Sequence, residues 1–274
     1  MIDCKLICSD VDGTLVSHGG EISEENRSWI RRVVEERHIP FAIVSGRFRS
    51  GVTILQEQLG IPVALCCFNG AYVEVDGKCI VSEPITISQA KSIVEIAKRY
   101  CIECIVFDRD QWYVAPDSEW YAAQYAMYKQ KGRVGDLIEL LDGWELSGHP
   151  CYKVIPKSRD PEKLALLRQA MECELSSQLH IFASSPVIIE TARKNVDKAN
   201  VIPVLSSYYH ISPSQVMAFG DYDNDFGMLK AAGFPVAMGN GTDEIKRVAC
   251  YVTDDNLHDG VAKAISHFFF CEKL

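Results

Sequence analysis

The stretch CKLICSDVDGT, residues 4–14, decides the fold class of this chain. Its apolar first half predicts a short buried strand that ends directly at Asp10 and Asp12. Gly13 permits a tight turn and a close approach of the backbone to a ligand, and Thr14 adds a hydroxyl group. In open α/β sheets, ligands bind beyond the carboxyl ends of the strands. The stretch therefore indicates a ligand site, although an ordinary polar turn could have the same composition.

The segments that follow alternate between helix and strand. A helix is predicted over 22–37, where Ser23 is a suitable N-cap. The apolar strand FAIV at 41–44, a helix at 48–59 and the apolar strand VALCC at 63–67 come next. Near-continuous apolar strands separated by helices are typical of a parallel sheet covered on both faces. We therefore expect an α/β fold with a Rossmann-like parallel-sheet core.

The pattern changes after Asn69. The runs AYVEV and CIVSE, on either side of Asp76 and Gly77, predict a hairpin with a tight turn. Helical patterns then alternate with the short strands ECIVF, WYVA, CYKVI and LHIFA; the helices are predicted over 88–100, 118–131 and 161–173. The parallel pattern returns with VMAFGD and PVAMGN. We expect a core of residues 1–82 and 187–274, interrupted by an α+β insert of residues 83–186.

Composition excludes several classes of protein. The 274 residues include 28 basic and 37 acidic side chains, which give a net charge of −9. A nucleic-acid binder needs a basic surface, so we expect no nucleic acid among the partners. The longest uncharged stretch, 199–220, carries two prolines and many polar residues, so we expect no membrane span. The N-terminus does not resemble a signal peptide, and the 11 scattered cysteines favour reduced thiols in the cytoplasm.

A second acidic cluster, GDYDND at residues 220–225, also follows an apolar strand directly. Asp221, Asn224 and Asp225 offer oxygen ligands of the kind that Mg²⁺ prefers. A solvated acidic loop is the alternative interpretation. If one parallel sheet brings both clusters to the same edge, two carboxylates 4 Å apart repel by about 4 kcal/mol at an effective dielectric of 20. Such an arrangement requires a cation, a shared proton or both.

Three further segments add polar groups at strand or helix ends. Ser45, Gly46 and Arg47 follow the strand FAIV, and Asn69 follows VALCC. Lys198 begins a helical stretch in which Asp197 is a possible N-cap. Each feature alone is also compatible with a capping or solvent-exposed role.

Together these motifs resemble those of the haloacid dehalogenase superfamily of phosphotransferases, specifically its Cof-like, IIB-capped phosphatases. DVDGT at 10–14 is similar to the first motif of that family, VSGR at 44–47 to the second, Lys198 to the third and GDYDND to the fourth. The long interval between the second and third motifs is where the family inserts a cap domain. Lys194 lies close to the third motif, but the spacing to Asp221 and the position at a helix start favour Lys198.

The resemblance implies a mechanism. Asp10 would be the nucleophile that forms an aspartyl phosphate, and Asp12 the general acid and base. The implied catalytic set is Asp10, Asp12 and Lys198; the implied Mg²⁺ ligands, direct or through water, are Asp10, the Asp12 carbonyl, Asp221, Asn224 and Asp225. The residues implied to bind phosphate or substrate are Gly13, Thr14, Ser45, Gly46, Arg47, Asn69, Lys198 and Asn224.

The expected function is Mg²⁺-dependent hydrolysis of a small phosphorylated metabolite, such as a sugar phosphate. A phosphomutase of the same superfamily and a non-catalytic phosphate-binding module remain the alternatives. The cap is expected to select the substrate. Aromatic residues of the cap are candidates for this role, although packing in the cap's own core is their more common use: Trp112, Tyr113, Trp120 and Tyr121. The sequence leaves the substrate's identity and the oligomeric state open.

Overall fold

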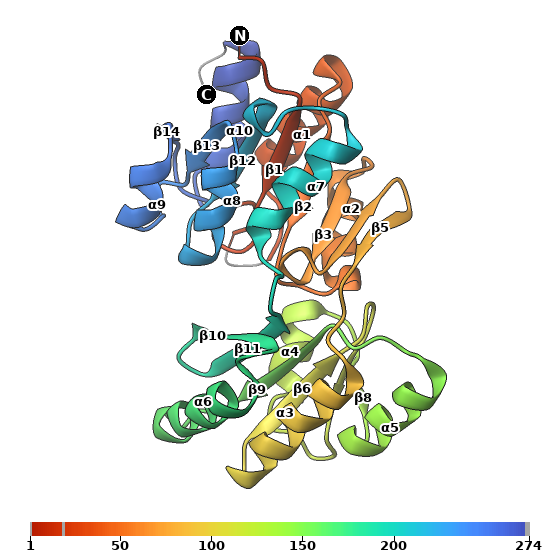
Figure 1. Ribbon diagram of the computed structural model, residues 1–274. Helices are drawn as coiled ribbons and strands as arrows, with labels where there is room; N and C mark the ends of the chain where they lie inside the picture. The colour runs from red at the N-terminus through yellow and green to blue at the C-terminus, as the bar shows by residue number, and fades with distance from the viewer. Residues whose placement is uncertain (1, 18–19, 272–274) are drawn as a thin grey trace. The chain divides into compact units, whose positions relative to one another are not determined.

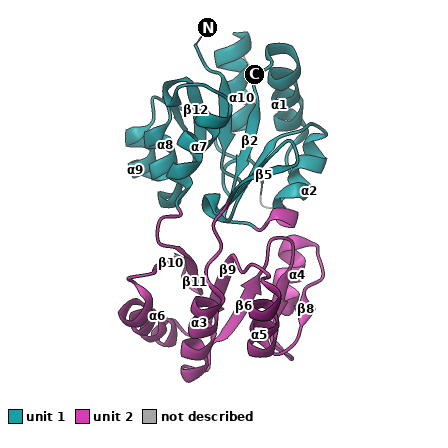
Figure 2. Ribbon diagram, turned by 45° about the vertical axis from the view of Figure 1, so that its right-hand side comes forward, with its two compact units in different colours: residues 1–47, 52–81, 197–274 teal, residues 48–51, 82–196 magenta. Residues whose placement is uncertain are grey.

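The computed structural model describes residues 2–17 and 20–271. The chain divides into two compact units (Figure 2). The first unit comprises residues 1–47, 52–81 and 197–274, and the second comprises residues 48–51 and 82–196.

The first unit is built on an eight-stranded sheet with the order β14-β13-β12-β1-β2-β3-β4-β5. The strands are β1 (Leu6–Ser9), β2 (Phe41–Val44), β3 (Ala64–Cys67), β4 (Tyr72–Val75), β5 (Lys78–Ser82), β12 (Val216–Gly220), β13 (Phe234–Ala237) and β14 (Tyr251–Val252). The six strands from β14 to β3 run parallel, and β4 pairs with β3 in the antiparallel direction. The strand order places β12 directly beside β1.

Helices lie on both faces of this sheet (Figure 1). They are α1 (Glu24–Arg37), α2 (Arg49–Leu59), α7 (Val201–Tyr208), α8 (Phe226–Ala231), α9 (Asp243–Val248) and α10 (Gly260–Ile265). Apolar side chains of α7, α8 and α9 pack against alternate strand residues such as Leu6, Ala42 and Ala218. On the other face, α1 and α10 contact each other. This architecture confirms the predicted α/β fold, because strands that are buried on both sides need the apolar runs seen in the sequence.

Local sequence signals explain several element boundaries. Ser23 caps α1 by accepting a hydrogen bond from the Asn26 amide, so the helix begins at Glu24 and not at residue 22. The β4–β5 hairpin turns at Asp76 and Gly77, which have φ angles of 50° and 72°. Two consecutive positive φ angles are the geometry of a type I′ turn, which matches the twist of the flanking strands.

The second unit is a six-stranded sheet with the order β10-β11-β9-β6-β7-β8, packed against helices. Its strands are β6 (Glu103–Phe107), β7 (Trp112–Val114), β8 (Arg133–Val134), β9 (Lys153–Lys157), β10 (Leu179–Ser185) and β11 (Ile188–Arg193), and its helices are α3 (Ile87–Arg99), α4 (Tyr121–Tyr128), α5 (Leu137–Ser147) and α6 (Pro161–Leu175). Residues of α3, α5 and α6 form one apolar core with Cys104, Val106 and Val154 of the sheet.

Three features of the second unit differ from the sequence-based description. Helix α5 was not among the predicted helices, and α4 is shorter than the predicted 118–131. The boundary between the units falls after residue 196, whereas the sequence pattern predicts it after residue 186. The reason is that β11 pairs with β10 and β9 and therefore belongs to the second sheet. Of the four aromatic candidates, Trp112, Tyr113 and Trp120 are buried and Tyr121 is half-buried.

Within residues 2–17 and 20–271, no helix combines the length and apolar character that a membrane crossing requires. All 11 cysteines are free thiols, and the neighbouring Cys101 and Cys104 are exposed and buried, respectively.

Candidate active site

Two acidic loops meet where β1 and β12 end. The two strands pair in parallel, with Ser9 opposite Phe219, and the Asp10 amide continues the ladder by donating to the Phe219 carbonyl at 3.1 Å. Asp10 therefore emerges from the sheet beside Asp221, which follows β12. The carboxyl ends of adjacent parallel strands place the two loops at one edge, as the α/β rule for ligand sites requires.

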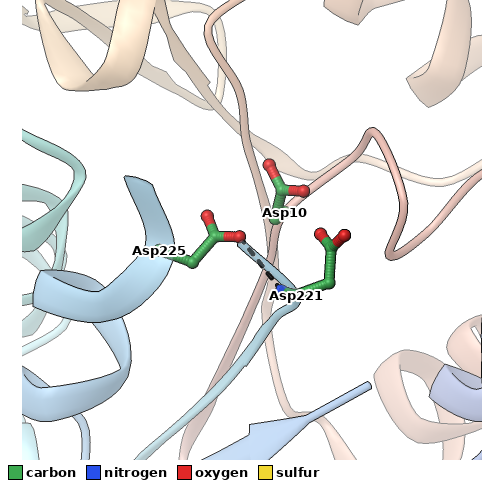
Figure 3. Close-up of side chains that lie close together, drawn as sticks. All are labelled: Asp10, Asp221 and Asp225. Atoms are coloured by element: carbon green, nitrogen blue, oxygen red, sulfur yellow. Dashed lines mark hydrogen bonds between the residues drawn. The ribbon is translucent and has the colours of Figure 1, made fainter. Parts of the chain in front are cut away.

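Three carboxylates converge at this edge (Figure 3). One oxygen from each of Asp10, Asp221 and Asp225 lies within 4.8 Å of the others. Asp225 is fully buried, and its second oxygen accepts hydrogen bonds from the backbone amides of Asp221 at 3.1 Å and Tyr222 at 3.3 Å. These amide contacts fold the loop back on itself and hold the Asp225 carboxylate in place.

Burial and mutual repulsion make this cluster electrostatically strained. Burial and the nearby Asp225 carboxylate raise the pKa of Asp10, and the contact with Lys198 only partly offsets this. Burial and Asp225 also raise the pKa of Asp221 to about 6, although Thr14 opposes the shift by donating its hydroxyl to Asp221 Oδ1 at 3.0 Å. The cluster therefore holds more negative charge than its protein surroundings neutralise.

Lys198 supplies a cation from within the protein. Its Nζ donates to Asp10 Oδ1 at 2.5 Å and to Asp225 Oδ1 at 2.7 Å, and the side chain is almost fully buried. Burial alone would lower the pKa of Lys198, but the two carboxylates raise it above its ordinary value. Asp197 caps the 3-10 turn that begins at Lys198 by accepting from the Ala199 amide at 2.7 Å. Lys194 instead donates to the carbonyl of Ser176 in the second unit.

The donor set fits a divalent cation. Three ionised carboxylates and one ammonium group sum to −2, and carboxylate oxygens are the ligands that Mg²⁺ accepts most readily. A cation of charge +2 would relieve the repulsion that raises the pKa values of Asp10 and Asp221. The residues present therefore suit a metal such as Mg²⁺.

Gly13 allows the two loops to approach closely. Its φ angle is +88°, and a Cβ atom at this position would clash with the Asp221 carboxylate. The Gly13 carbonyl accepts a hydrogen bond from Asn240 Nδ2 at 2.8 Å, and the same amide group lies 3.4 Å from Asp221 Oδ2. Asn240 was not among the predicted site residues. Its sequence signal is the same as that of the other motifs, because it follows an apolar strand, β13, that ends at this edge.

The loop after β2 adds a second group of polar residues. Ser45 is buried, and its hydroxyl accepts from the Arg47 amide at 3.2 Å, with Gly46 between them. The Ser45 carbonyl accepts from the Asn69 amide at 2.8 Å. Asn69 has a left-handed conformation, and its side-chain Oδ1 is buried without a hydrogen-bond partner among the described residues.

Asp12 and Arg47 pair with each other. Arg47 Nε lies 3.1 Å from Asp12 Oδ2, and Arg47 Nη2 lies 2.5 Å from Asp12 Oδ1. Asn224 lies on the exposed side of the 3-10 turn Asp223–Asp225, next to the buried Asp225. The structure thus gathers Asp10, Asp221, Asp225, Lys198 and Thr14 by direct side-chain contacts, and places the remaining predicted residues in the loops around them.

Known proteins resemble this chain over nearly its whole length. A model of the haloacid dehalogenase-like hydrolase family matches residues 7–265. Two phosphatases of Bacillus subtilis are similar over most of both chains. The 5-amino-6-(5-phospho-D-ribitylamino)uracil phosphatase YitU is 29% identical over 96% of this chain and 97% of its own, and the phosphatase YcsE of the same name is 28% identical over 97% and 96%.

A solved structure also has a similar fold. The crystal structure of a haloacid dehalogenase-like hydrolase from Bacteroides thetaiotaomicron superimposes with a TM-score of 0.88 at 27% identity, covering 97% of this chain and all of that one. The family match spans nearly the whole chain and includes both acidic loops. The chain therefore belongs to the haloacid dehalogenase-like hydrolase family and is an enzyme of its phosphatase type.

Proposed function

We propose that this enzyme hydrolyses a small phosphomonoester in two steps, with Mg²⁺ as its cofactor. Asp10 acts as the nucleophile, and Asp12 acts as general acid and then as general base. The observation that carries the proposal is the convergence of the buried Asp10 carboxylate with Lys198, Asp221 and Asp225 at the carboxyl edge of the sheet.

In the first step, an Asp10 carboxylate oxygen attacks phosphorus, and the bond from phosphorus to the ester oxygen breaks. Asp12 gives its proton to the departing alkoxide, so the alcohol leaves in neutral form. In the second step, Asp12 takes a proton from water, whose oxygen attacks the phosphorus of the Asp10 phosphoester. The products are inorganic phosphate and the regenerated Asp10 carboxylate. Splitting the reaction into two displacements lets one side chain serve both proton transfers.

The metal would be held by Asp10, Asp221 and Asp225, with the Asp12 carbonyl and Asn224 completing the set. When bound, a divalent cation would neutralise part of the negative charge of these carboxylates and of the phosphoryl group. Lys198 holds Asp10 and Asp225 in place and offers a fixed positive charge to the transferred group.

The loops around the cluster would bind the substrate. The Ser45 hydroxyl and the backbone of the loops that contain Gly13, Thr14 and Gly46 suit phosphoryl oxygens, whereas the Thr14 hydroxyl already donates to Asp221. The unpartnered Asn69 Oδ1 is a buried acceptor, and a hydroxyl group of the organic portion would satisfy it.

The organic portion of the substrate is proposed to be a small metabolite, a sugar phosphate or a related compound. The two relatives from Bacillus subtilis are named for a substrate with a phosphorylated ribityl chain, which belongs to this chemical class. We further propose that residues 82–196 act as the cap that selects the organic portion. A cytoplasmic location is proposed from the free state of all 11 cysteines.

A phosphate-release screen over a panel of phosphorylated metabolites with Mg²⁺ tests the proposal. We expect release from at least one phosphomonoester without a bisphosphate activator, and loss of this activity in Asp10→Asn, which keeps the side-chain shape but removes the nucleophile. Excess chelator should abolish turnover. Unchanged activity in chelator would contradict the metal requirement, and conversion of a sugar phosphate into its isomer that requires a bisphosphate activator and releases no phosphate would indicate a phosphomutase.

A further inference from the structure

Arg47 makes a two-point contact with Asp12. Two nitrogens of the guanidinium group each face a different carboxylate oxygen, at 3.1 Å and 2.5 Å. Such a contact fixes the plane of the carboxylate as well as its position, because a planar fork matches the two oxygens only in one orientation. The contact joins the loop after β1 to the loop after β2.

Asp12 needs an external partner to hold one orientation. Its side chain is 55% exposed, in contrast to the buried side chain of Asp10 two residues earlier. Among the described residues, Arg47 is the one that hydrogen-bonds to the Asp12 carboxylate. An exposed aspartate without a partner would sample several χ1 rotamers, and most of them would point the carboxylate away from a fixed leaving group.

Arg47 is itself firmly placed. Its side chain is only 10% exposed. Its amide donates to Ser45 Oγ at 3.2 Å, and its carbonyl accepts from the Phe68 amide at 2.9 Å. The Ser45 amide in turn donates to the Cys66 carbonyl at 2.8 Å, which links this loop to β3. The guanidinium group therefore extends from a loop that hydrogen bonds hold in place.

We infer that Arg47 is a positioning residue: it holds the Asp12 carboxylate in the orientation needed for proton transfer to the leaving group, and it is not a phosphate ligand. The inference rests on the proposed function of Asp12. It also revises the interpretation of Arg47 drawn from the sequence, because the guanidinium edge that would grip a phosphate faces Asp12. A guanidinium paired with a carboxylate adds no net charge toward a phosphate dianion.

Kinetics with two kinds of substrate separate the two roles. An alkyl phosphate needs a proton on its leaving group, whereas an aryl phosphate with an acidic phenol does not. In Arg47→Lys and Arg47→Met, we expect kcat for the alkyl ester to fall by about 10–100-fold, since misplacing a catalytic group by 1 Å can cost about 10²-fold. Formation of the phosphoenzyme from the aryl ester should change by less than about threefold. Inhibition by inorganic phosphate should stay within about twofold of the wild-type value.

A phosphate ligand would give a different pattern. Equal losses on both esters, together with weaker inhibition by phosphate, would overturn the inference. Arg168→Met is the matched control, because it removes an exposed arginine that pairs with Glu172 on α6 of the second unit. This control should leave all three measurements unchanged.

A double-mutant cycle tests whether Arg47 acts through Asp12. Once Asp12→Ala has removed the carboxylate, adding Arg47→Met should cause no further loss of alkyl-ester turnover, because the two residues work as one unit. Independent, multiplicative losses would show that Arg47 has a separate role and would overturn the inference.

A crystal structure of Arg47→Met gives a readout that does not depend on activity. We expect the Asp12 side chain to occupy more than one rotamer, or a new one. A single Asp12 conformation identical to that of the wild-type protein would contradict the inference. Failure of the wild-type enzyme to hydrolyse any phosphomonoester would instead refute the proposed function, and the crystal structure would still decide whether Arg47 orients Asp12.

Discussion

Lys198 Nζ lies 2.5 Å from Asp10 Oδ1, although 188 positions separate the two residues in the chain. The contact is buried at both ends and is extended by Asp225 at 2.7 Å. A buried ammonium between two carboxylates is favourable only while all partners are present, because each ion has lost its hydration. The stability of the core and the chemistry of the site therefore depend on the same side chains.

Removing the Lys198 cation should destabilise the metal-free protein. Lys198→Met leaves Asp10 and Asp225 buried without their cation, and breaking a buried ion pair costs about 3–5 kcal/mol. Denaturant unfolding in chelator measures the loss, which should be larger at pH 8 than at pH 5 because the carboxylates can take up protons at the lower pH. Lys194→Met is the control and should have little effect. An equally large loss in Lys194→Met would argue against this explanation.

The cluster of Asp10, Asp221 and Asp225 should make the free energy of unfolding of the metal-free protein fall as pH rises. The folded-state pKa of Asp221 is about 6, above its ordinary value of 3.8, and the pKa of Asp10 is also raised. The folded state then binds more protons than the unfolded state, so the free energy of unfolding decreases from about pH 4 to beyond pH 6.

Removing one carboxylate tests this pH dependence. In chelator, Asp221→Asn should be more stable than the wild-type protein at pH 8 and close to it at pH 4. Saturating Mg²⁺ should stabilise the wild-type protein at pH 8 by mass action, and Asp221→Asn much less. Denaturant titrations of both proteins with and without Mg²⁺ measure these differences. If the free energy of unfolding changed with pH in the same way in both proteins, the three carboxylates would not be the source of the pH dependence.

A trapping experiment should distinguish the roles of Asp10 and Asp12. In the proposed mechanism, Asp12→Ala keeps the nucleophile but lacks the base for the second step, a loss that typically costs about 10²–10⁴ in rate. With an aryl phosphate, the phosphoenzyme should accumulate and appear after acid quench as a phosphate mass increment on the peptide that contains Asp10. Asp10→Asn should give no label. A label on a different residue, or one that persists in Asp10→Asn, would overturn the assignment of the nucleophile.

Gly13→Ala should impair the site more than it impairs the fold. Alanine at φ +88° is strained by roughly 1–2 kcal/mol, and its Cβ atom would also displace the Asp221 carboxylate. We expect loss of turnover and weaker Mg²⁺ binding, measured by calorimetry. Gly77→Ala is a matched control, since Gly77 has φ +72° and nothing within 4 Å of the added Cβ. It should lose a comparable amount of stability and keep its activity.

The sequence alone determined the features that depend on neighbouring residues. Apolar runs followed by acidic turns predicted the buried strands β1 and β12, and the capping side chains Ser23 and Asp197 marked where helical segments begin. These signals are local, because a strand's burial and a helix's first turn are set by residues a few positions apart. The α/β class followed from the repetition of such signals.

Only the tertiary structure decided which distant residues meet. The pairing of β12 with β1 brings Asp221 beside Asp10. The tertiary packing also places Lys198 Nζ in contact with Asp10. The pairing of β11 with β9 and β10 assigned residues 187–196 to the second unit.

The residues that neighbour Arg47 in the sequence also do not identify its hydrogen-bond partner. An arginine after a strand can bind a phosphate or a carboxylate equally well. Which of them it binds depends on whether an acceptor near another strand lies within reach of its guanidinium group. Asp12 lies within that reach because β1 and β2 are neighbours in the sheet. Strand order is set by the burial of whole faces and by chain connectivity, so no short window of sequence contains it.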